Sequence, residues 1–234
     1  MIPKKIHYCW FGRNPKPKQA VKCISSWEKY CPDYEIIEWN EDNFEVKKYP
    51  YAQYCFNEQK YAFLSDFARL IIIRDHGGLY FDTDVELIKR PDELLNNKAF
   101  FGFENDEYVA SGLGFGAEKE HIVIQKMIDE YKGLETENGS FELKGCPILN
   151  TAALVKLGLK QNGSEQVVEG AHIFPLDFFN PYDDPTGRLN ITDNTYSIHW
   201  YAKSWMSKSK IIRSKLTRPF HRLLGVDFFR KFKR

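Results

Sequence analysis

Two aspartates separated by one residue are the part of the sequence best suited to chemistry. Asp82 and Asp84 follow an apolar run that ends at Phe81. Alternate residues of an extended segment point to the same face, so we expect the two carboxylates to lie together. Carboxylates at such short range repel each other unless a cation or hydrogen-bond donors neutralise them. A divalent cation with oxygen ligands meets that need, and it can also hold a diphosphate.

The same short string also fits less specific sites. An exposed acidic turn is a common setting for Asp-x-Asp, and on these residues alone that interpretation stays open. A calcium-binding EF-hand loop would need glycine at its sixth position, where Leu87 stands. A phosphatase with Asp82 as nucleophile would have Thr or Val at the position of Glu86. The sequence therefore weakens the last two alternatives but not the first.

An acid–base pair lies upstream of the two aspartates. Asp66 and Arg69 are spaced i, i+3 in a segment with helical periodicity, so they share one face of the predicted helix. They lie outside its apolar stripe, and a tight Gly77-Gly78 turn joins the helix to the strand that leads to Asp82. The pair can therefore lie close to the two aspartates. The alternative is a surface ion pair, worth roughly a few tenths of a kcal/mol.

The elements that must position these residues alternate between strands and helices. Apolar patterns predict strands at 6–10, 34–39, 79–87, 99–104, 112–117, 172–174 and 196–200. They predict helices at 18–30, 58–76, 120–131 and 147–157, and irregular segments at 49–57 and 132–144. The β-α-β start implies a parallel sheet and an α/β fold, and such sheets bind ligands at the carboxyl ends of their strands.

Composition excludes several classes of protein. The 234 residues include 33 Lys and Arg and 32 Asp and Glu, a net charge of +1 that argues against a nucleic-acid binder. With 43% hydrophobic residues the chain is not disordered, and no apolar run reaches the length of a membrane span. No apolar segment typical of a secretory signal follows the first residues, and five cysteines without a CxxC pair favour reduced thiols in the cytosol.

The small net charge conceals a strongly basic end. Residues 203–234 carry 11 Lys and Arg and one acid, a net +10, whereas the remainder carries 22 bases and 31 acids, a net −9. Apolar residues such as Ile212, Leu216 and Leu223 interleave with these bases at nearly helical spacing, interrupted by Pro219. Such basic amphipathic segments are typical of attachment to an anionic membrane. Packing on the acidic remainder, or contact between copies, are the alternatives.

Three blocks of sequence together resemble the DXD-type sugar transferases. Ile2–Gly12 is similar to the family's IPKxIHxxWfG opening, and Ser65–Arg69 with His76–Asp84 resembles its SDxxR…GGxYxDxD signature. His199–Trp205 resembles the HxW…SW segment near the family's end. The blocks occur in family order over residues 2–205. The family includes bacterial capsular and exopolysaccharide transferases and Och-type mannosyltransferases, and it shares its core with the glucosyltransferase domains of large clostridial toxins.

The resemblance implies an α/β GT-A glycosyltransferase fold: one Rossmann-like, nucleotide-sugar-binding domain over residues 1–205 and a basic helical tail over 206–234. It implies that the catalytic residues are Asp66, Arg69, Asp82 and Asp84. It implies that the donor contacts are Trp10, Asp66, Arg69, Tyr80, Asp82, Ser204 and Trp205, with the last two closing over the diphosphate. It implies that Mn²⁺ or Mg²⁺ is the cofactor, with Asp82, Asp84 and His199 as its ligands.

The reaction implied is transfer of a hexose from a nucleotide-sugar with retention of configuration. We expect a UDP-sugar as donor and a saccharide or polyprenyl-diphosphate-linked acceptor, as in bacterial capsular or surface polysaccharide synthesis. The expected place is the cytoplasmic side of the cell membrane, as a peripheral protein, with no nucleic-acid partner. Among Glu104, Asp106 and Asn150 nothing singles out a nucleophile, so a same-face internal return is favoured over double displacement.

Two other classes of function remain open on the sequence. One is a metal-dependent phosphohydrolase or nucleotidyltransferase that uses Asp82 and Asp84. The other is a non-catalytic module that binds carbohydrate or membrane. The first leaves the Asp66–Arg69 pair without a role, and the second does not need the pair and the two aspartates together.

Overall fold

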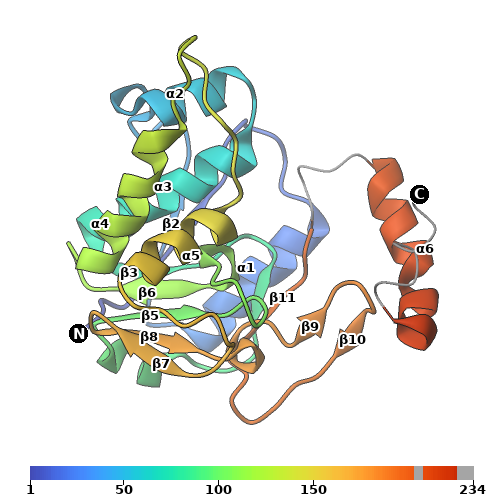
Figure 1. Cartoon of the computed structure of the whole chain (residues 1–234). Helices are drawn as coiled ribbons and strands as arrows, with labels where there is room; N and C mark the ends of the chain where they lie inside the picture. Colours follow the sequence, from blue (N-terminus) through green and yellow to red (C-terminus); the bar gives the residue numbers. More distant parts are fainter. Residues whose placement is uncertain (203–207, 226–234) are drawn as a thin grey trace.

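A seven-stranded sheet forms the centre of the molecule, between two layers of helices (Figure 1). The computed structural model describes residues 1–202 and 208–225. The strands are β1 (Lys5–Cys9), β2 (Glu35–Trp39), β3 (Gly78–Tyr80), β5 (Ala99–Gly102), β6 (Phe115–Ala117), β7 (Gln166–Val168) and β8 (Ala171–Phe174). Their spatial order is β2-β1-β3-β6-β5-β8-β7. This mixed, largely parallel sheet confirms the predicted α/β class.

The direction of the strands decides where a ligand can be held. β1 is parallel to both β2 and β3, and β5 is parallel to β8. β6 lies between β3 and β5 and is antiparallel to both, so β3 and β5 run in the same direction. The carboxyl ends of β1, β3 and β5 therefore meet at one edge of the sheet. That edge is where parallel sheets collect their functional residues.

Helices cover both faces of the sheet. α2 (Pro50–Asn57), α3 (Tyr61–His76), α4 (Ile122–Asp129) and α5 (Cys146–Lys156) pack on one face, and α1 (Lys18–Tyr30) packs on the other. Alternation along β3 supplies both cores, because Tyr80 belongs to the α3 side whereas Leu79 and Phe81 belong to the α1 side. Trp27 anchors α1: its fully buried indole donates a hydrogen bond to the carbonyl of Val85 at 2.8 Å.

Two antiparallel ribbons stand beside the main sheet. β4 (Val85–Leu87) pairs with β11 (Ser197–His199), and β9 (Tyr182–Asp183) pairs with β10 (Arg188–Leu189). α6 (Lys208–Leu224) lies beside the β9–β10 hairpin, away from the central sheet (Figure 1). Short 3₁₀ turns complete the fold: η1 (Val46–Lys48), η2 (Asp92–Asn96), η3 (Ser111–Leu113), η4 (Glu130–Leu134) and η5 (Leu176–Phe178). No helix among the described residues is both long and apolar enough to cross a bilayer.

The predicted strand over 79–87 is wrong in one respect that matters for the site. β3 ends at Tyr80, and the chain turns through Asp82–Asp84, where the Val85 amide donates to the Asp82 carbonyl at 3.0 Å. β4 then pairs with β11 and not with the main sheet. The two aspartates therefore lie on a turn between two sheets, and not on alternate positions of one strand.

Three other expectations also differ from the structure. Residues 50–57, expected to be irregular, form α2, because Pro50 opens the helix and Tyr51, Ala52 and Cys55 are buried on one side. The strand expected at 112–117 begins only at Phe115, since Ser111–Leu113 form a 3₁₀ turn. α6 continues through Pro219, where an interruption was expected.

Candidate functional site

Arg69 is the centre of the candidate site, and helix α3 places it there. Its side chain is only 2% exposed, although its helix begins at the surface. The Nη2 atom lies 2.8 Å from a carboxylate oxygen of Asp66 and 2.8 Å from one of Asp82. A buried guanidinium is tolerated because both carboxylates neutralise it and accept its hydrogen bonds. The structure thus brings together three of the four predicted catalytic residues in direct contact.

A glycine turn makes this contact possible. Gly77 ends α3 with φ 64°, and Gly78 opens β3 with φ 108°, a left-handed backbone that favours glycine. A Cβ at Gly78 would lie 2.9 Å from the Lys5 carbonyl oxygen, so the close approach of β3 to β1 also needs glycine. The turn reverses the chain and sets Asp82 against the Arg69 face of α3.

Burial sets the charge state of the cluster. Desolvation raises the pKa of Asp82 to about 6, against the lowering effect of the Arg69 guanidinium. Desolvation likewise raises the pKa of Asp66, again opposed by Arg69. For Arg69, burial lowers the pKa, but Asp82 and Asp66 outweigh it and hold it well above its ordinary value. Arg69 is therefore always charged, and it keeps two partly buried carboxylates in place.

Asp84 pairs with a different partner at the end of the β4–β11 ribbon. Its Oδ1 atom lies 3.3 Å from Nε2 of His199, and its Oδ2 accepts a hydrogen bond from the Ala202 amide at 2.7 Å. Burial raises the pKa of Asp84, but His199 and the Ala202 amide outweigh it and lower the pKa to about 2. Burial lowers the pKa of His199, but the combined effect of Asp84, Asp82 and Glu104 outweighs it and raises the pKa above its ordinary value.

The donor set of Asp84 and His199 fits a divalent cation in part. Carboxylate and imidazole are both ligands of such cations, and the buried Nδ1 atom of His199 has no hydrogen-bond partner within the described residues. Both oxygens of Asp82, in contrast, accept hydrogen bonds from Arg69 at 2.8 and 3.0 Å. Within residues 1–202 and 208–225, no three His, Cys, Asp or Glu side chains converge to hold a metal ion. The predicted set of three ligands stays a prediction, with two of its members in contact.

Two predicted donor contacts occupy distinct places. Trp10 follows β1 at the carboxyl edge, where its half-buried indole donates to the Asn14 carbonyl at 2.6 Å and Lys16 lies over its ring. Tyr80 is fully buried: Arg69 stacks on its ring at 4.9 Å, and its hydroxyl donates to Asp82 at 3.2 Å. The Tyr80 hydroxyl thus holds Asp82, and the predicted contact of Tyr80 with the donor stays a prediction.

Glu104 is the carboxylate that the structure adds to the site. It follows β5 at the same sheet edge, and burial raises its pKa although His199 opposes this shift. The Tyr201 hydroxyl donates to it over a long 3.5 Å, and the Tyr201 ring lies 4.1 Å from the His199 ring. Asn180 holds both residues, through the Glu104 carbonyl at 2.8 Å and the Tyr201 hydroxyl at 2.7 Å. Of the three nucleophile candidates, Glu104 is the acid that faces the cluster.

Three supporting residues escaped the sequence patterns. The Cys146 amide, at the N-terminus of α5, donates to Asp66 at 3.3 Å, where the helix dipole also favours a carboxylate. Ser111 accepts from Arg69 at 3.4 Å, and its own amide is held by Asn150 at 3.0 Å. A Cβ at Gly112 would lie 2.7 Å from an Asp82 oxygen. The glycine-rich stretch at 112–116 is the sequence feature that could have indicated this part of the site.

The predicted closing residues Ser204 and Trp205 lie outside the described residues. The chain that leads to them is anchored at the site, since the Trp200 and Ala202 amides donate to the Asp84 carbonyl and side chain at 2.9 and 2.7 Å. The Trp200 indole donates to Glu86 at 2.8 Å and packs against Tyr182.

Comparison with known proteins agrees with this geometry. Residues 17–101 match the family model described as a glycosyltransferase sugar-binding region containing a DXD motif. The chain is 30% identical over 136 residues to mannosyl phosphorylinositol ceramide synthase CSH1 of Saccharomyces cerevisiae, a match over 56% of this chain and 36% of that protein. It is 31% identical over 107 residues to inositol phosphoceramide mannosyltransferase 2 of Schizosaccharomyces pombe, over 41% and 28% of the two chains.

A solved structure supports the fold as well. The PaToxG glycosyltransferase superimposes with a TM-score of 0.52 at 21% identity, over 66% of this chain and 69% of that chain. The match of the family model includes the Asp66–Arg69 pair and the two aspartates of the turn. The chain itself spans only about a third, 36%, of the first curated relative. Over residues 17–101 the chain is therefore similar to the DXD-type sugar transferases, and its fold is similar to that of a solved glycosyltransferase.

Proposed function

We propose that this protein is a glycosyltransferase that moves a hexose from a nucleotide-sugar to the hydroxyl of a saccharide or lipid-linked acceptor. The observation that carries the proposal is the buried contact of Arg69 with Asp66 and Asp82, beside Asp84 and His199 at the carboxyl edge of the sheet. A phosphohydrolase that uses Asp82 and Asp84 leaves the Asp66–Arg69 pair without a role, and a binding module does not need the pair and the two aspartates together.

Each group has a distinct part in the proposed reaction. A divalent cation bound at Asp84 and His199 would supply positive charge to the departing diphosphate. Asp66 is held by Arg69 and by the Cys146 amide, with its carboxylate 16% exposed, so it can accept hydrogen bonds from sugar hydroxyls. Arg69 fixes the orientation of both carboxylates before substrate arrives, and such preorganisation lowers the barrier without rearrangement during the reaction.

Retention of configuration by a same-face internal return is the mechanism we favour. In that reaction the leaving phosphate accepts the proton of the acceptor hydroxyl, and no enzyme carboxylate bonds to the anomeric carbon. Glu104 is placed to orient a substrate hydroxyl, because its partly buried carboxylate accepts, among the described residues, one long hydrogen bond, from Tyr201. We propose Mn²⁺ or Mg²⁺ as the cation and a UDP-hexose as the donor. The mannosyl activity in the names of both yeast relatives makes GDP-mannose the donor to compare.

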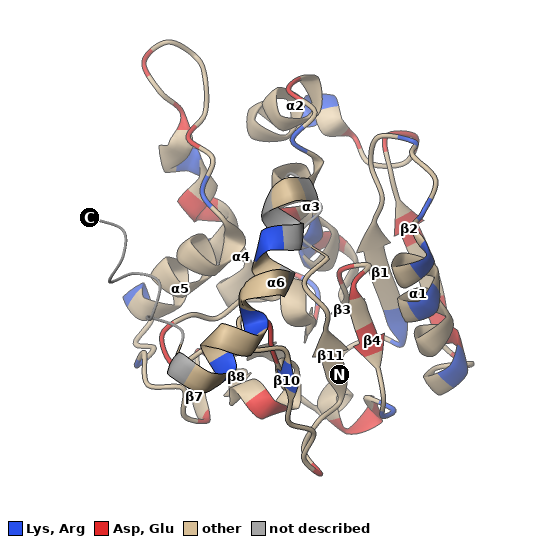
Figure 2. Ribbon diagram, turned by 90° about the vertical axis from the view of Figure 1, so that its right-hand side faces the viewer, with Lys and Arg blue, Asp and Glu red and all other residues tan. Residues whose placement is uncertain are grey.

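The acceptor is proposed to be anchored in an anionic membrane, on which α6 lies. Arg218 pairs with Asp184 of the β9–β10 hairpin at 2.9 Å, and Arg222 donates to the Gly187 carbonyl at 2.9 Å. One side of α6 is thereby fixed to the protein. Figure 2 shows Lys and Arg recurring along this helix, which crosses in front of the hairpin.

On the opposite side of α6, apolar side chains are exposed to solvent. Leu216 and Leu223 are 68% and 83% exposed and lie seven residues apart, on the same side of the helix. The basic stretch to which they belong carries a net +10, which favours a bilayer of anionic lipids over a neutral surface. The names of the yeast relatives also refer to ceramide acceptors, which are membrane lipids. A role in capsular or surface polysaccharide synthesis, at the inner face of the cell membrane, is the setting we propose.

The direct test is turnover of a panel of nucleotide-sugars. The full chain is incubated with UDP-glucose, UDP-galactose, GDP-mannose and related donors, with Mn²⁺ or with a chelator, and release of nucleoside diphosphate is measured. Metal-dependent release from one donor is the expected result. Phosphate release from simple phosphate esters would instead identify a phosphohydrolase. Saccharide binding without any donor turnover would identify a binding module and overturn the proposal.

A further inference from the structure

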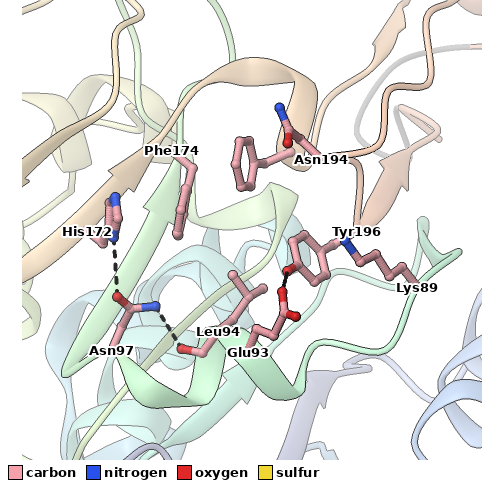
Figure 3. Close-up of a pocket in the computed structure, with 9 residues that line it drawn as sticks. Lys89, Glu93, Leu94, Asn97, His172, Phe174, Asn194 and Tyr196 are labelled. Atoms are coloured by element: carbon pink, nitrogen blue, oxygen red, sulfur yellow. Dashed lines mark hydrogen bonds between the residues drawn. The ribbon is translucent and has the colours of Figure 1, made fainter.

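A cavity lies away from the Arg69 cluster, at the other end of the β4–β11 ribbon. Its volume is about 380 Å³, within the range of small-molecule sites. Figure 3 shows His172 and Phe174 on one side of it and Tyr196 and Lys89 on the other, with Leu94 between them. The ribbon is three residue pairs long, so the cavity and the Asp84–His199 pair are about 10 Å apart along the strands.

Aromatic rings form a continuous wall of this cavity. The rings of His172 and Phe174 are stacked at 4.1 Å, and those of Phe174 and Phe178 at 4.5 Å. Tyr196 extends the series, at 6.2 Å from Phe178 with an interplanar angle of 26°. Nearly parallel rings offer flat apolar surface, which the C–H face of a sugar ring can cover. Core packing alone does not need such a wall to border an open cavity, and Phe178 is only half-buried there.

Polar groups surround the wall and retain hydrogen-bonding capacity. Glu93 accepts from the Tyr196 hydroxyl at 2.8 Å through one oxygen, and a carboxylate can accept several further bonds. Asn97 meets His172 Nδ1 at 3.3 Å through its carbonyl and donates one of its two N–H groups to Leu94. Asn194 donates from its side-chain nitrogen to Asp177, while its carbonyl oxygen is available at the cavity. Both donors and acceptors are thus offered to a ligand.

The charges at the cavity favour a neutral ligand. Lys89 lies 4.4 Å above the Tyr196 ring and donates to the Asp193 carbonyl, so its charge is partly engaged. Glu93 lines the same cavity, and Glu165 binds His172 Nε2 at 2.7 Å. A phosphate or nucleotide would meet the Glu93 carboxylate, whereas a polyhydroxyl ligand would hydrogen-bond to it.

We propose that this cavity is a second saccharide-binding site, which holds one sugar ring of the acceptor glycan against the Phe174–Phe178 wall. Its assignment to the acceptor rests on the proposed transferase function, but saccharide binding itself does not. The β4–β11 ribbon connects the two sites directly: Val85 pairs with His199 at one end, and the amides of Ile88 and Lys89 donate to the Tyr196 carbonyl at the other.

The probes for this site are the methyl α-glycosides of glucose, galactose and mannose. Each is titrated into the ¹⁵N-labelled full chain, and the side-chain amide signals of Asn97 and Asn194 are followed. We expect saturable shifts with a Kd in the millimolar range for at least one glycoside, about 1–10 mM. Phe178→Leu keeps an apolar side chain but removes the ring, and it should weaken binding about tenfold. Asn194→Ala, at an exposed position, should weaken binding several-fold.

Asn190→Ala is the matched control, since Asn190 is an exposed amide on the hairpin, outside the cavity. It should leave binding unchanged. UDP with Mn²⁺ should leave the glycoside shifts unchanged as well, because it occupies the other site. Absence of saturable shifts, displacement by UDP, or unchanged binding by both cavity variants would overturn the proposal. Glycoside binding without donor turnover would contradict the transferase function alone, and turnover without glycoside binding would contradict the second site alone.

Discussion

At the scale of single residues, the three carboxylates of the site differ in the partners that hold them. Arg69 binds both oxygens of Asp82, whereas Asp66 is held by Arg69 and the Cys146 amide, and Asp84 by His199 and the Ala202 amide. All three side chains are partly exposed, Asp82 the most at 27%. The spacing of Asp82 and Asp84 predicted two carboxylates on one face that call for a divalent cation. The structure distinguishes them, because Asp82 completes the buried ion cluster and Asp84 lies against His199. That difference arises from the turn at 82–84, which the Asp-x-Asp spacing could not reveal.

Glu104→Gln tests whether the site uses a covalent intermediate. In the same-face mechanism Glu104 only accepts a hydrogen bond. The substitution should therefore lower kcat by about 10- to 100-fold, which corresponds to the free energy of one hydrogen bond to a charged group. Glu107→Gln, an exposed acid in the same loop, should have no effect. Steady-state transfer and intact-protein mass spectrometry of enzyme with donor are the measurements. Complete loss of transfer, together with a hexosylated Glu104 in the wild-type protein, would contradict the mechanism.

At the scale of elements, residues with strong local patterns could be predicted and those governed by distant partners could not. The helix over 18–30 has the predicted bounds, and the long helix ends at His76 as predicted. Periodicity and the Gly77 turn depend only on neighbouring residues, so the folded structure has the elements that they predict. The break after Tyr80 could not be predicted, because β4 pairs with β11, more than a hundred residues later in the chain. The place of Glu104 in the site could not be predicted for the same reason, because its hydrogen bond comes from the distant residue Tyr201.

His7 illustrates how one element is fixed to another. Its Nδ1 accepts from the Trp39 indole at 3.0 Å, so its Nε2 carries the proton and donates to the Gly77 carbonyl at 3.0 Å. This neutral imidazole connects β1 and β2 to the turn that positions Asp82. Burial lowers its pKa from 6.5 to about 4, which the Gly77 hydrogen bond only partly opposes. The folded protein therefore resists protonation of His7 between these two pH values.

Stability should consequently fall as pH drops from about 6.5 to 4. In this window the unfolded chain binds a proton at His7 and the folded chain does not, so the free energy of unfolding decreases on acidification, by on the order of 3 kcal/mol. Urea unfolding at several pH values, for the wild-type protein and His7→Asn, measures the effect. The variant should be less stable at pH 7 and should lack this part of the pH dependence. An identical pH dependence in both proteins would contradict the role of His7.

At the scale of the whole molecule, the proposed catalysis and the proposed membrane binding belong to parts of the chain with opposite net charge. The acidic remainder holds the buried carboxylate cluster, and the +10 stretch includes α6 beside the hairpin. The sequence predicted the basic, interleaved character of this stretch. It could not predict that Arg218 and Arg222 face the hairpin, since contacts with 184–187 fix the orientation of the helix. Packing on the acidic part and binding to a membrane are thus compatible, on opposite sides of one helix.

Leu216→Ser with Leu223→Ser tests the membrane side of α6. The double variant should bind vesicles of phosphatidylglycerol and phosphatidylcholine several-fold more weakly than the wild type, because two exposed apolar side chains are lost while the charge is kept. Vesicle co-sedimentation at low and high salt is the measurement. Val21→Ser, an exposed apolar residue on α1, should bind as the wild type does. Equal binding by the double variant, or no preference for anionic vesicles, would count against a membrane-bound α6.

We propose that Asp84, beside His199 and the Arg69 cluster, holds the cation that a sugar transferase needs. Metal-dependent release of nucleoside diphosphate should be measured for the wild type, Asp84→Asn and Asp75→Asn, an exposed acid at the far end of α3. We predict that Asp84→Asn lowers kcat by about three orders of magnitude or more with its fold and thermal unfolding preserved, whereas Asp75→Asn stays at the wild-type rate. Wild-type turnover by a folded Asp84→Asn protein, still abolished by chelator, would contradict the claim.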